Sequence, residues 1–166
     1  MVAASLANLK PDALYVCGYG EAILACMVEV RNTTFSGTVC STAAISTVDL
    51  VWRGGKLLEG LYFPMVTIDM TSSKEPIASF VKQYRAKFDF AADNYAAHGY
   101  DAALATLFAF AEPAPKSATE LRSRFLKLGS KMGVTGPMNF DDTGNISEPL
   151  QIHWIREGKV ELYQGT

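Results

Sequence analysis

The stretch PDALYVCGYGEAILACMVEVR, residues 11–31, decides the fold of this 166-residue chain. Its apolar run Ala13–Cys17 lies between a Pro-Asp pair and a Gly-Tyr-Gly turn, which is typical of a buried strand. From Glu21 to Arg31 apolar residues recur at helical spacing, so a helix is predicted to follow the strand directly. A strand, a tight glycine turn and a helix together open an α/β unit.

The flanking sequence continues this alternation. Residues 4–9 predict the end of a helix, which Pro11 stops because the residue before a proline avoids helical backbone angles. Two more strands are predicted at 37–40 and 61–66, with a helix over 42–52 between them. We therefore expect residues 1–66 to form a Rossmann-like α/β unit, a parallel sheet flanked by helices on both faces.

After residue 66 the pattern changes from alternation to helices alone. Apolar stripes at helical spacing predict helices over 75–88, 97–111 and 118–131. The last one follows Ser117-Ala118-Thr119-Glu120, a capping box in which serine caps one backbone amide and glutamate reaches back to another. Three helices with no strand between them cannot continue the first sheet, so residues 67–132 are expected to pack elsewhere.

The last part of the chain, residues 133–166, is predicted to be β structure. A turn at 141–145 precedes an alternating segment in which Leu150, Ile152 and Trp154 are expected to form the apolar face. A second turn at 157–159 leads into a strand over 160–163. This pattern predicts a C-terminal β-hairpin.

The composition excludes several classes of protein. Hydrophobic residues make up 49% and charged residues 19%, so the chain can bury a core and is not disordered. The net charge of −2 argues against a nucleic-acid surface or a polybasic membrane patch. No apolar run reaches the ~18 residues of a membrane span. The first ten residues do not form a secretory signal, which leaves a cytoplasmic protein or a mature or trimmed piece as alternatives.

Metal and acid–base chemistry find little support. The three cysteines form no closed set and show no CxxC spacing, so we expect buried free thiols, no metal site and no cofactor. Asp141 and Asp142 lack the later residues of a calcium loop and are expected to form a plain turn. His98 and Asp101 lie three residues apart on a helix, but no nucleophile accompanies them. We therefore expect exposed helix polarity there and no enzymatic activity.

The turn at residues 18–20 is the best candidate for a ligand site. Dinucleotide folds bind pyrophosphate at such a turn, but Ile23 occupies the third glycine position and no acidic residue follows the second strand. In open parallel sheets the carboxyl ends of the strands face the ligand crevice. Tyr19 at one strand end and Ser41-Thr42-Ala43 at the next are therefore expected to line the same edge. A tight turn without ligand contact is the alternative for Tyr19.

Five segments, taken in order, resemble one protein family. They are KPDA through GYG (10–20), LEGL (58–61), GYDAA (99–103), GVTGP (133–137) and FDDTG (140–144). Together they look like the C-terminal half of a type I periplasmic solute-binding protein, in the group of the leucine/isoleucine/valine-binding proteins of ABC importers. The resemblance covers nearly the whole chain.

The resemblance implies two lobes joined by three crossovers, with a small amino acid, amide or organic acid bound between them. Residues 1–66 would belong to the second lobe, 67–132 would add helices to the first, and 133–166 would return as the hairpin. It also implies a periplasmic protein that delivers its ligand to ABC permease subunits and carries out no catalysis. The helical stripes would cover a sheet whose strands lie outside this sequence. The chain could pack these helices on its own sheet of residues 1–66, pair with a second copy, or be a piece of a complex with the rest of the protein. Of these three we expect self-association as a homo-oligomer.

The family's ligand residues transfer in part. Tyr19 matches a tyrosine that meets the ligand, and Tyr95 matches an aromatic residue that packs on the ligand side chain. The acidic partner of an amino-acid ammonium should fall near Thr42–Ala43, where there is none; Glu21 is a candidate substitute. A buried ammonium without a carboxylate is costly, which favours ligands that lack one. A ligand-sensing regulatory domain on the same fold and a small nucleotide-binding protein of the flavodoxin type stay open as alternatives.

Overall fold

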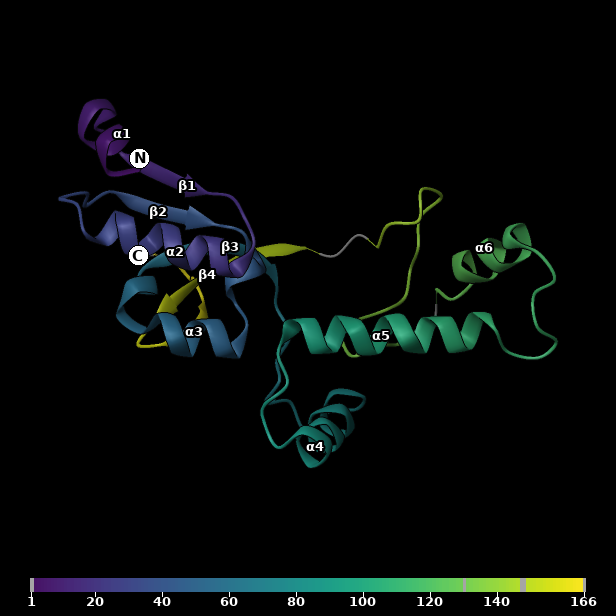
Figure 1. The fold of residues 1–166 in the computed structure, drawn as a ribbon. Coiled ribbons are helices and arrows are strands. Elements are labelled where there is room, and N and C mark those ends of the chain that lie inside the picture. The colour runs from purple at the N-terminus through teal and green to yellow at the C-terminus, as the bar shows by residue number, and fades with distance from the viewer. Residues whose placement is uncertain (1, 130, 147–148, 166) are drawn as a thin grey trace. The chain divides into compact units, whose positions relative to one another are not determined.

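The computed structural model describes residues 2–129, 131–146 and 149–165, which form two compact units (Figure 1). The first unit comprises residues 1–67 and 150–166, and the second comprises residues 68–149. The segment 133–149 therefore belongs to the helical unit, and the hairpin itself occupies residues 150–162.

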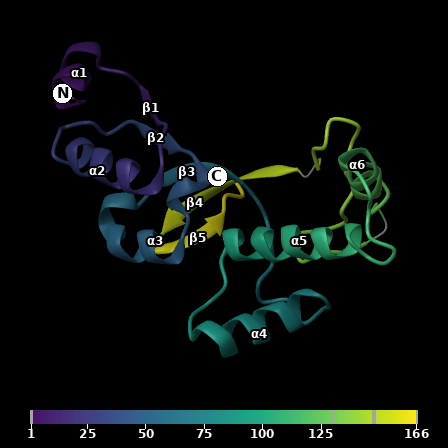
Figure 2. The ribbon, with the colours of Figure 1, turned by 45° about the vertical axis from the view of Figure 1, so that its right-hand side comes forward.

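The first unit is built on a five-stranded sheet in the order β1-β2-β3-β4-β5 (Figure 2). Strands β1 (Ala13–Val16), β2 (Thr38–Ser41) and β3 (Leu61–Val66) are parallel to one another. The hairpin of β4 (Leu150–Arg156) and β5 (Lys159–Leu162) joins antiparallel to β3. The predicted α/β fold with a C-terminal hairpin is confirmed, and the hairpin completes a mixed sheet.

Helical segments alternate with the parallel strands as predicted. They are α1 (Val2–Leu9), α2 (Gly20–Arg31), the short 3₁₀ turns η1 (Ala43–Ile45) and η2 (Gly55–Leu58), and α3 (Val48–Gly54). The single helix predicted over 42–52 is wrong, because Ser46 and Thr47 interrupt it. The Thr47 hydroxyl accepts a hydrogen bond from the Leu50 backbone N–H (3.4 Å), so this threonine begins a new helix instead of continuing the previous one.

One hydrophobic core holds the first unit together. The strands contribute Val16, Val39, Leu61, Phe63 and Ile155, and the helical segments contribute Leu6, Ile23, Met27, Val30, Ile45, Leu50, Val51 and Leu58. The strand register places all five strand residues on the same face of the sheet. Full burial of each large aliphatic or aromatic side chain stabilises the unit by about 1.5–3 kcal/mol before the entropy cost.

The opposite face of the sheet carries a row of side chains across the strands. Tyr15, Cys40, Tyr62 and Trp154 are register neighbours; Tyr62 stacks on Trp154 (5.7 Å between ring centroids) and Tyr15 is 59% exposed. Among the described residues of this unit, the core helices cover one face only. The expectation of helices on both faces is not met here.

The face of the hairpin that is buried is the opposite of the predicted face. Leu150 and Ile152 are 65% and 47% exposed, whereas His153 and Ile155 are buried. Because side chains alternate with a period of two, an error of one residue reverses every position. The prediction of Leu150, Ile152 and Trp154 as the buried apolar face is therefore wrong.

His153 can point inward because both of its ring nitrogens have partners. Nε2 lies 3.2 Å from Thr67 Oγ1 and Nδ1 lies 3.1 Å from the Gln151 carbonyl oxygen. The imidazole also stacks on Phe63, with ring planes 18° apart. A buried polar ring with satisfied hydrogen bonds carries little penalty, so the sequence pattern of apolar residues alone misassigned this strand.

The second unit consists of α4 (Ile77–Phe88), α5 (Asn94–Ala109), α6 (Ala118–Leu126) and the segments that precede and follow these helices. The three predicted helices are confirmed with shifted ends. α5 begins earlier because the Asp93 carboxylate accepts from the Ala96 backbone N–H (2.8 Å) and caps it. α6 ends five residues before the predicted position.

The capping box of α6 forms in part. Ser117 Oγ accepts from the Glu120 backbone N–H (3.2 Å) as predicted. The Glu120 carboxylate instead accepts from the backbone N–H of Lys116 (2.9 Å), one residue further out. The serine cap is therefore correct and the glutamate partner is displaced by one residue.

Two small hydrophobic clusters hold the second unit. Phe80, Ala97 and Val134 form the first, between α4, α5 and the segment 133–135. The second joins α5, α6 and the following segment, and it contains Ala105, Leu128 and Met138 with the half-buried Leu104, Phe108, Phe125 and Phe140 around them. The helical stripes are thus partly buried against their own unit.

Candidate functional site

The structure brings the ends of β1 and β2 together through two side-chain hydrogen bonds. Ser41 Oγ donates to the Val16 carbonyl oxygen (2.8 Å), and Thr42 Oγ1 donates to the Gly18 carbonyl oxygen (3.2 Å). These contacts fasten the turn after β1 to the turn after β2. We refer to residues 18–20 and 41–43 together as the strand-end site.

The side chains of this site differ sharply in their access to solvent. Tyr19 is 88% exposed, whereas Ser41 is fully buried; Thr42 and Ala43 are half-buried. The Ser41 hydroxyl donates its proton within the protein, so its position here is structural. The Tyr19 ring and hydroxyl are therefore accessible to solvent at this edge.

Two helical segments begin at the strand-end site. Tyr19 is the N-cap of α2 and Thr42 is the N-cap of η1, and neither side chain caps its helix. The first backbone N–H groups of α2 have no partner within the helix, as in any helix. The site therefore combines the first backbone N–H groups of α2 with the exposed ring and hydroxyl of Tyr19.

The second glycine of the turn has an internal role. A Cβ at Gly20 would lie 2.8 Å from the Ala44 carbonyl oxygen and would collide with the Leu50 side chain. The close packing of α2 against η1 and α3 is therefore enough to explain why residue 20 is a glycine. Gly20 is therefore not evidence for a phosphate-binding turn. The nucleotide-binding alternative loses the main sequence feature that supported it.

Glu21 already has a charged partner. Its two carboxylate oxygens each lie 2.7 Å from Arg53 Nη2, and Arg53 also contacts Asp49. The hydrogen bond from Arg53 lowers the pKa of the Glu21 carboxyl below its usual value. Glu21 is thus poorly suited to act as the partner of a ligand ammonium.

Tyr95 lies in the other unit, near the start of α5. Its side chain is 46% exposed. Partial burial raises the pKa of the Tyr95 phenol, and the Asp93 carboxylate contributes in the same direction. The phenol therefore remains a neutral hydrogen-bond donor at physiological pH. Its role as a ligand contact stays a prediction.

Asp101 is not an exposed helix residue, contrary to the expectation from sequence. It is 9% exposed, and its carboxylate accepts from the backbone N–H groups of Val134 (2.8 Å) and Thr135 (2.7 Å) and from the Thr135 hydroxyl (2.7 Å). His98 is exposed and makes no contribution to this arrangement. The aspartate is a structural anchor for the segment after α6.

Two sequence segments that the resemblance singled out therefore meet in space. The carboxylate of the GYDAA segment binds the backbone of GVTGP, and a Cβ at Gly133 would collide with that carboxylate. The LEGL segment is structural as well. Glu59 accepts from the Glu157 backbone N–H (3.0 and 3.1 Å), and the Gly60 N–H donates to Ile155 (2.8 Å).

The described segments were compared with the requirements of a metal cluster and of a membrane-spanning helix. Within residues 2–129, 131–146 and 149–165, no group of three or more His, Cys, Asp or Glu side chains is placed to hold a metal ion. Over the same described part, no helix is long and apolar enough to cross a membrane. Asp141 forms a turn, accepting from the backbone N–H groups of Thr143 and Asn145 (both 2.9 Å).

Comparison with solved structures shows the fold. The leucine-binding protein LivK from Thermotoga maritima matches with a TM-score of 0.84 at 23% identity, over 96% of this chain and 46% of that one. LivJ from Streptococcus pneumoniae, solved in complex with isoleucine, gives a TM-score of 0.80 at 22% identity, over 95% and 46%. A solute-binding protein from R. palustris, in complex with benzoate, gives 0.80 at 18% identity, over 96% and 44%.

The chain thus spans slightly less than half the length of these three structures. A scan against protein-family models and a search of curated proteins give no match. The fold is that of part of a type I solute-binding protein of ABC transporters, as the sequence motifs predicted.

Proposed function

We propose that this chain is part of the solute-binding component of an ABC importer, and that its strand-end site contributes to binding a small solute. The observation that carries the proposal is the exposed Tyr19 at the joined ends of β1 and β2, on a fold shared with solute-binding proteins. We infer a binding role without catalysis, because the solved structures that share the fold are those of binding proteins. A periplasmic location and ABC permease subunits as partners follow from the same proposal.

The ligand class follows from the charges at the site. No acidic residue is present at Thr42–Ala43, and Glu21 is occupied by Arg53. An amino-acid ammonium would therefore lose a charge-assisted hydrogen bond, which is worth roughly 1.5–3 kcal/mol, or about 10- to 150-fold in affinity. We propose that the solute is an organic acid or amide without an α-ammonium group.

A matched set of ligands tests this proposal. Leucine, 4-methylpentanoate and 4-methylpentanamide share one side chain and differ in the ammonium and carboxylate groups. In a titration followed by ¹H–¹⁵N NMR, we expect the last two to shift the backbone amides of residues 18–20 and 41–43 at lower concentration than leucine. Tighter binding of leucine would contradict the ligand class.

A pair of tyrosine variants tests the site itself. Tyr19→Phe removes one hydroxyl at the site, and Tyr15→Phe makes the same change on the open face of the sheet. We expect about 10-fold weaker binding for Tyr19→Phe, the loss of one hydrogen bond, and unchanged binding for Tyr15→Phe. If both variants and the unmodified chain bind the ligand with equal affinity, the Tyr19 hydroxyl does not contact it and Tyr19 has a role in the turn only.

A further inference from the structure

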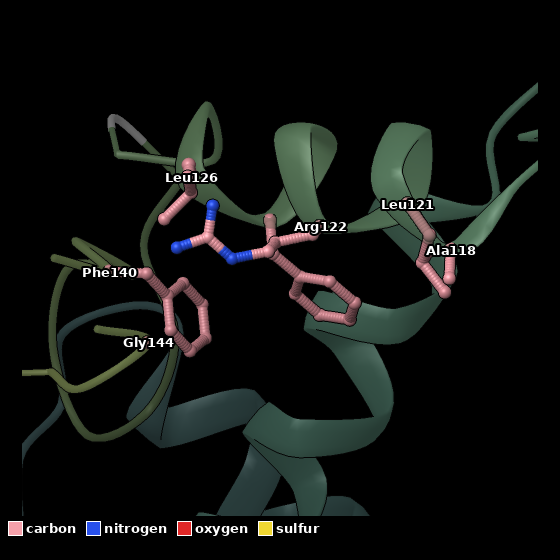
Figure 3. A pocket seen from close by; sticks show the side chains of 7 residues that line it. Ala118, Leu121, Arg122, Leu126, Phe140 and Gly144 are labelled. Atoms are coloured by element: carbon pink, nitrogen blue, oxygen red, sulfur yellow. The ribbon is translucent and has the colours of Figure 1, made fainter. Parts of the chain in front are cut away.

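The helical unit contains an apolar pocket that is separate from the strand-end site. It has a volume of about 410 Å³ and lies between α6 and the segment 140–144 (Figure 3). Leu121, Phe125 and Leu126 of α6 line it together with Phe140, and Arg122 supplies a charged group. This volume lies in the range of small-molecule sites, which are mostly apolar with a few polar groups that orient the ligand.

The walls of this pocket are held in place by specific contacts. Phe125 and Phe140 pack edge to face with ring centroids 5.7 Å apart. The Arg122 guanidinium donates to the backbone carbonyl oxygen of Asp142. Asp141 closes the turn behind Phe140 through hydrogen bonds from Thr143 and Asn145. The pocket is therefore bounded on both sides by ordered elements.

The exposed Arg122 guanidinium carries a positive charge at this pocket. Among residues 2–129, 131–146 and 149–165, no carboxylate lies within ion-pairing distance of its guanidinium. Arg124, on the same helix, shows the contrast: it pairs with Glu120 at 2.8 Å and also donates to carbonyl oxygens. One bond to the Asp142 carbonyl leaves further N–H donors of Arg122, which has five.

We propose that this pocket binds a monocarboxylate with an apolar body, such as a medium-chain fatty acid. The apolar side chains Leu121, Leu126 and Phe140 would receive the hydrocarbon, and Arg122 would bind the carboxylate with its remaining donors. Guanidinium groups match the planar carboxylate geometry. A single cation without a second basic group on the pocket wall favours a single negative charge over a phosphate ester. This proposal is independent of the function of the strand-end site.

A pair of eight-carbon probes tests the proposal on the 166-residue chain. Octanoate and 1-octanol share one hydrocarbon chain and differ in charge. In a ¹H–¹⁵N NMR titration, we expect octanoate to shift the amides of residues 118–126 and 140–144 in a saturable way, with about 10-fold tighter binding than 1-octanol. The amides of residues 18–20 and 41–43 report separately on any octanoate that binds at the strand-end site, so the two sites are distinguished by which amides shift.

Variants of α6 test whether the positive charge of Arg122 binds the carboxylate of octanoate. Arg122→Gln should weaken octanoate binding on the order of 5- to 10-fold and leave 1-octanol binding unchanged. Lys127→Gln removes the same charge from an exposed residue that does not line the pocket, and it should bind octanoate normally. If Arg122→Gln alters the turn at 140–144 before ligand is added, Arg122→Lys decides, because it retains the charge and should retain most of the affinity.

Three results would overturn the proposal. The first is the absence of saturable shifts at residues 118–126 and 140–144 with octanoate. The second is equal binding of octanoate by the unmodified chain and the Arg122→Gln variant. The third is a shift of the same amides on raising the protein concentration without any octanoate, which would show that a second copy of the chain fills the pocket.

Discussion

Replacement of Asp101 by alanine should release the segment 133–135 from α5. The carboxylate accepts from two backbone N–H groups, those of Val134 and Thr135, and from the Thr135 hydroxyl, at 2.7–2.8 Å. Val134 is 3% exposed, so water can replace the lost acceptor only if the segment opens. An unsatisfied buried donor costs about 1–3 kcal/mol, so the two amides together should cost roughly 3 kcal/mol.

Amide hydrogen exchange measures this loss where it occurs. A change of ~3 kcal/mol corresponds to about 100-fold faster exchange at Val134 and Thr135 when exchange proceeds through local opening. Asp142→Ala removes an exposed carboxylate from the same unit and should leave both amides protected. Unchanged protection in Asp101→Ala would refute the anchoring role, because the hydrogen bonds would then contribute nothing to holding the segment.

A double-mutant cycle adds a second check. Gly133→Ala places a Cβ against the Asp101 carboxylate, so it should disturb the same hydrogen bonds. Changes that share partners are not additive. The variant with both changes should therefore exchange little faster than Asp101→Ala alone, and full additivity would contradict a shared mechanism.

Four further predictions concern the first unit, the turn at 141–145 and the whole chain. Ser41→Ala removes a buried hydrogen bond between the ends of β1 and β2 and should lower the free energy of unfolding by about 1 kcal/mol, measured by urea denaturation. Burial raises the pKa of the Cys26 thiol, with Glu29 adding to the effect, so iodoacetamide at pH 8 should alkylate the exposed Cys17 well before Cys26; equal rates would contradict this. Hydrogen bonds to the Asp141 carboxylate lower its pKa below 3.8, and the bond from the Thr143 hydroxyl has the largest effect. Their stabilisation is therefore present above pH 3.8 and is lost as the pH falls through the lower folded pKa, which an NMR titration of the turn amides would show. Finally, the open aromatic face of the sheet and its free parallel edge at β1 should promote self-association with a second copy; a stable monomer by light scattering at micromolar concentration would refute it.

Much of the candidate site could be predicted from local sequence. The strand, turn and helix around Tyr19 follow from an apolar run, two glycines and helical spacing, and parallel strands bring their carboxyl ends to one edge of a sheet. Residues 41–43 therefore lie beside the turn at 18–20, as expected. The occupation of Glu21 by Arg53 could not be predicted, because it joins residues 32 positions apart on two helices whose packing is set by Gly20.

The burial of two polar residues was predicted wrongly from the sequence for a physical reason. A prediction from the spacing of apolar residues assumes that polar side chains face water, yet Asp101 and His153 are buried. Each can be buried because its partners come from distant parts of the chain: Thr135 for the aspartate and Thr67 for the histidine. No local pattern contains such a partner, so exposure and face were assigned wrongly at these positions.

The sequence by itself determined where most helices and strands form, because spacing, glycine turns, prolines and caps act within a few residues. It also determined the fold class and the absence of an acid at residues 42–43. Only the tertiary structure decided which face of each element is buried and that Ser41 is internal while Tyr19 is exposed. It also decided that Arg122 lies beside an apolar pocket with no carboxylate partner among the described residues. These properties depend on side chains that meet across long stretches of chain, and the burial and charge of a group are set by such neighbours.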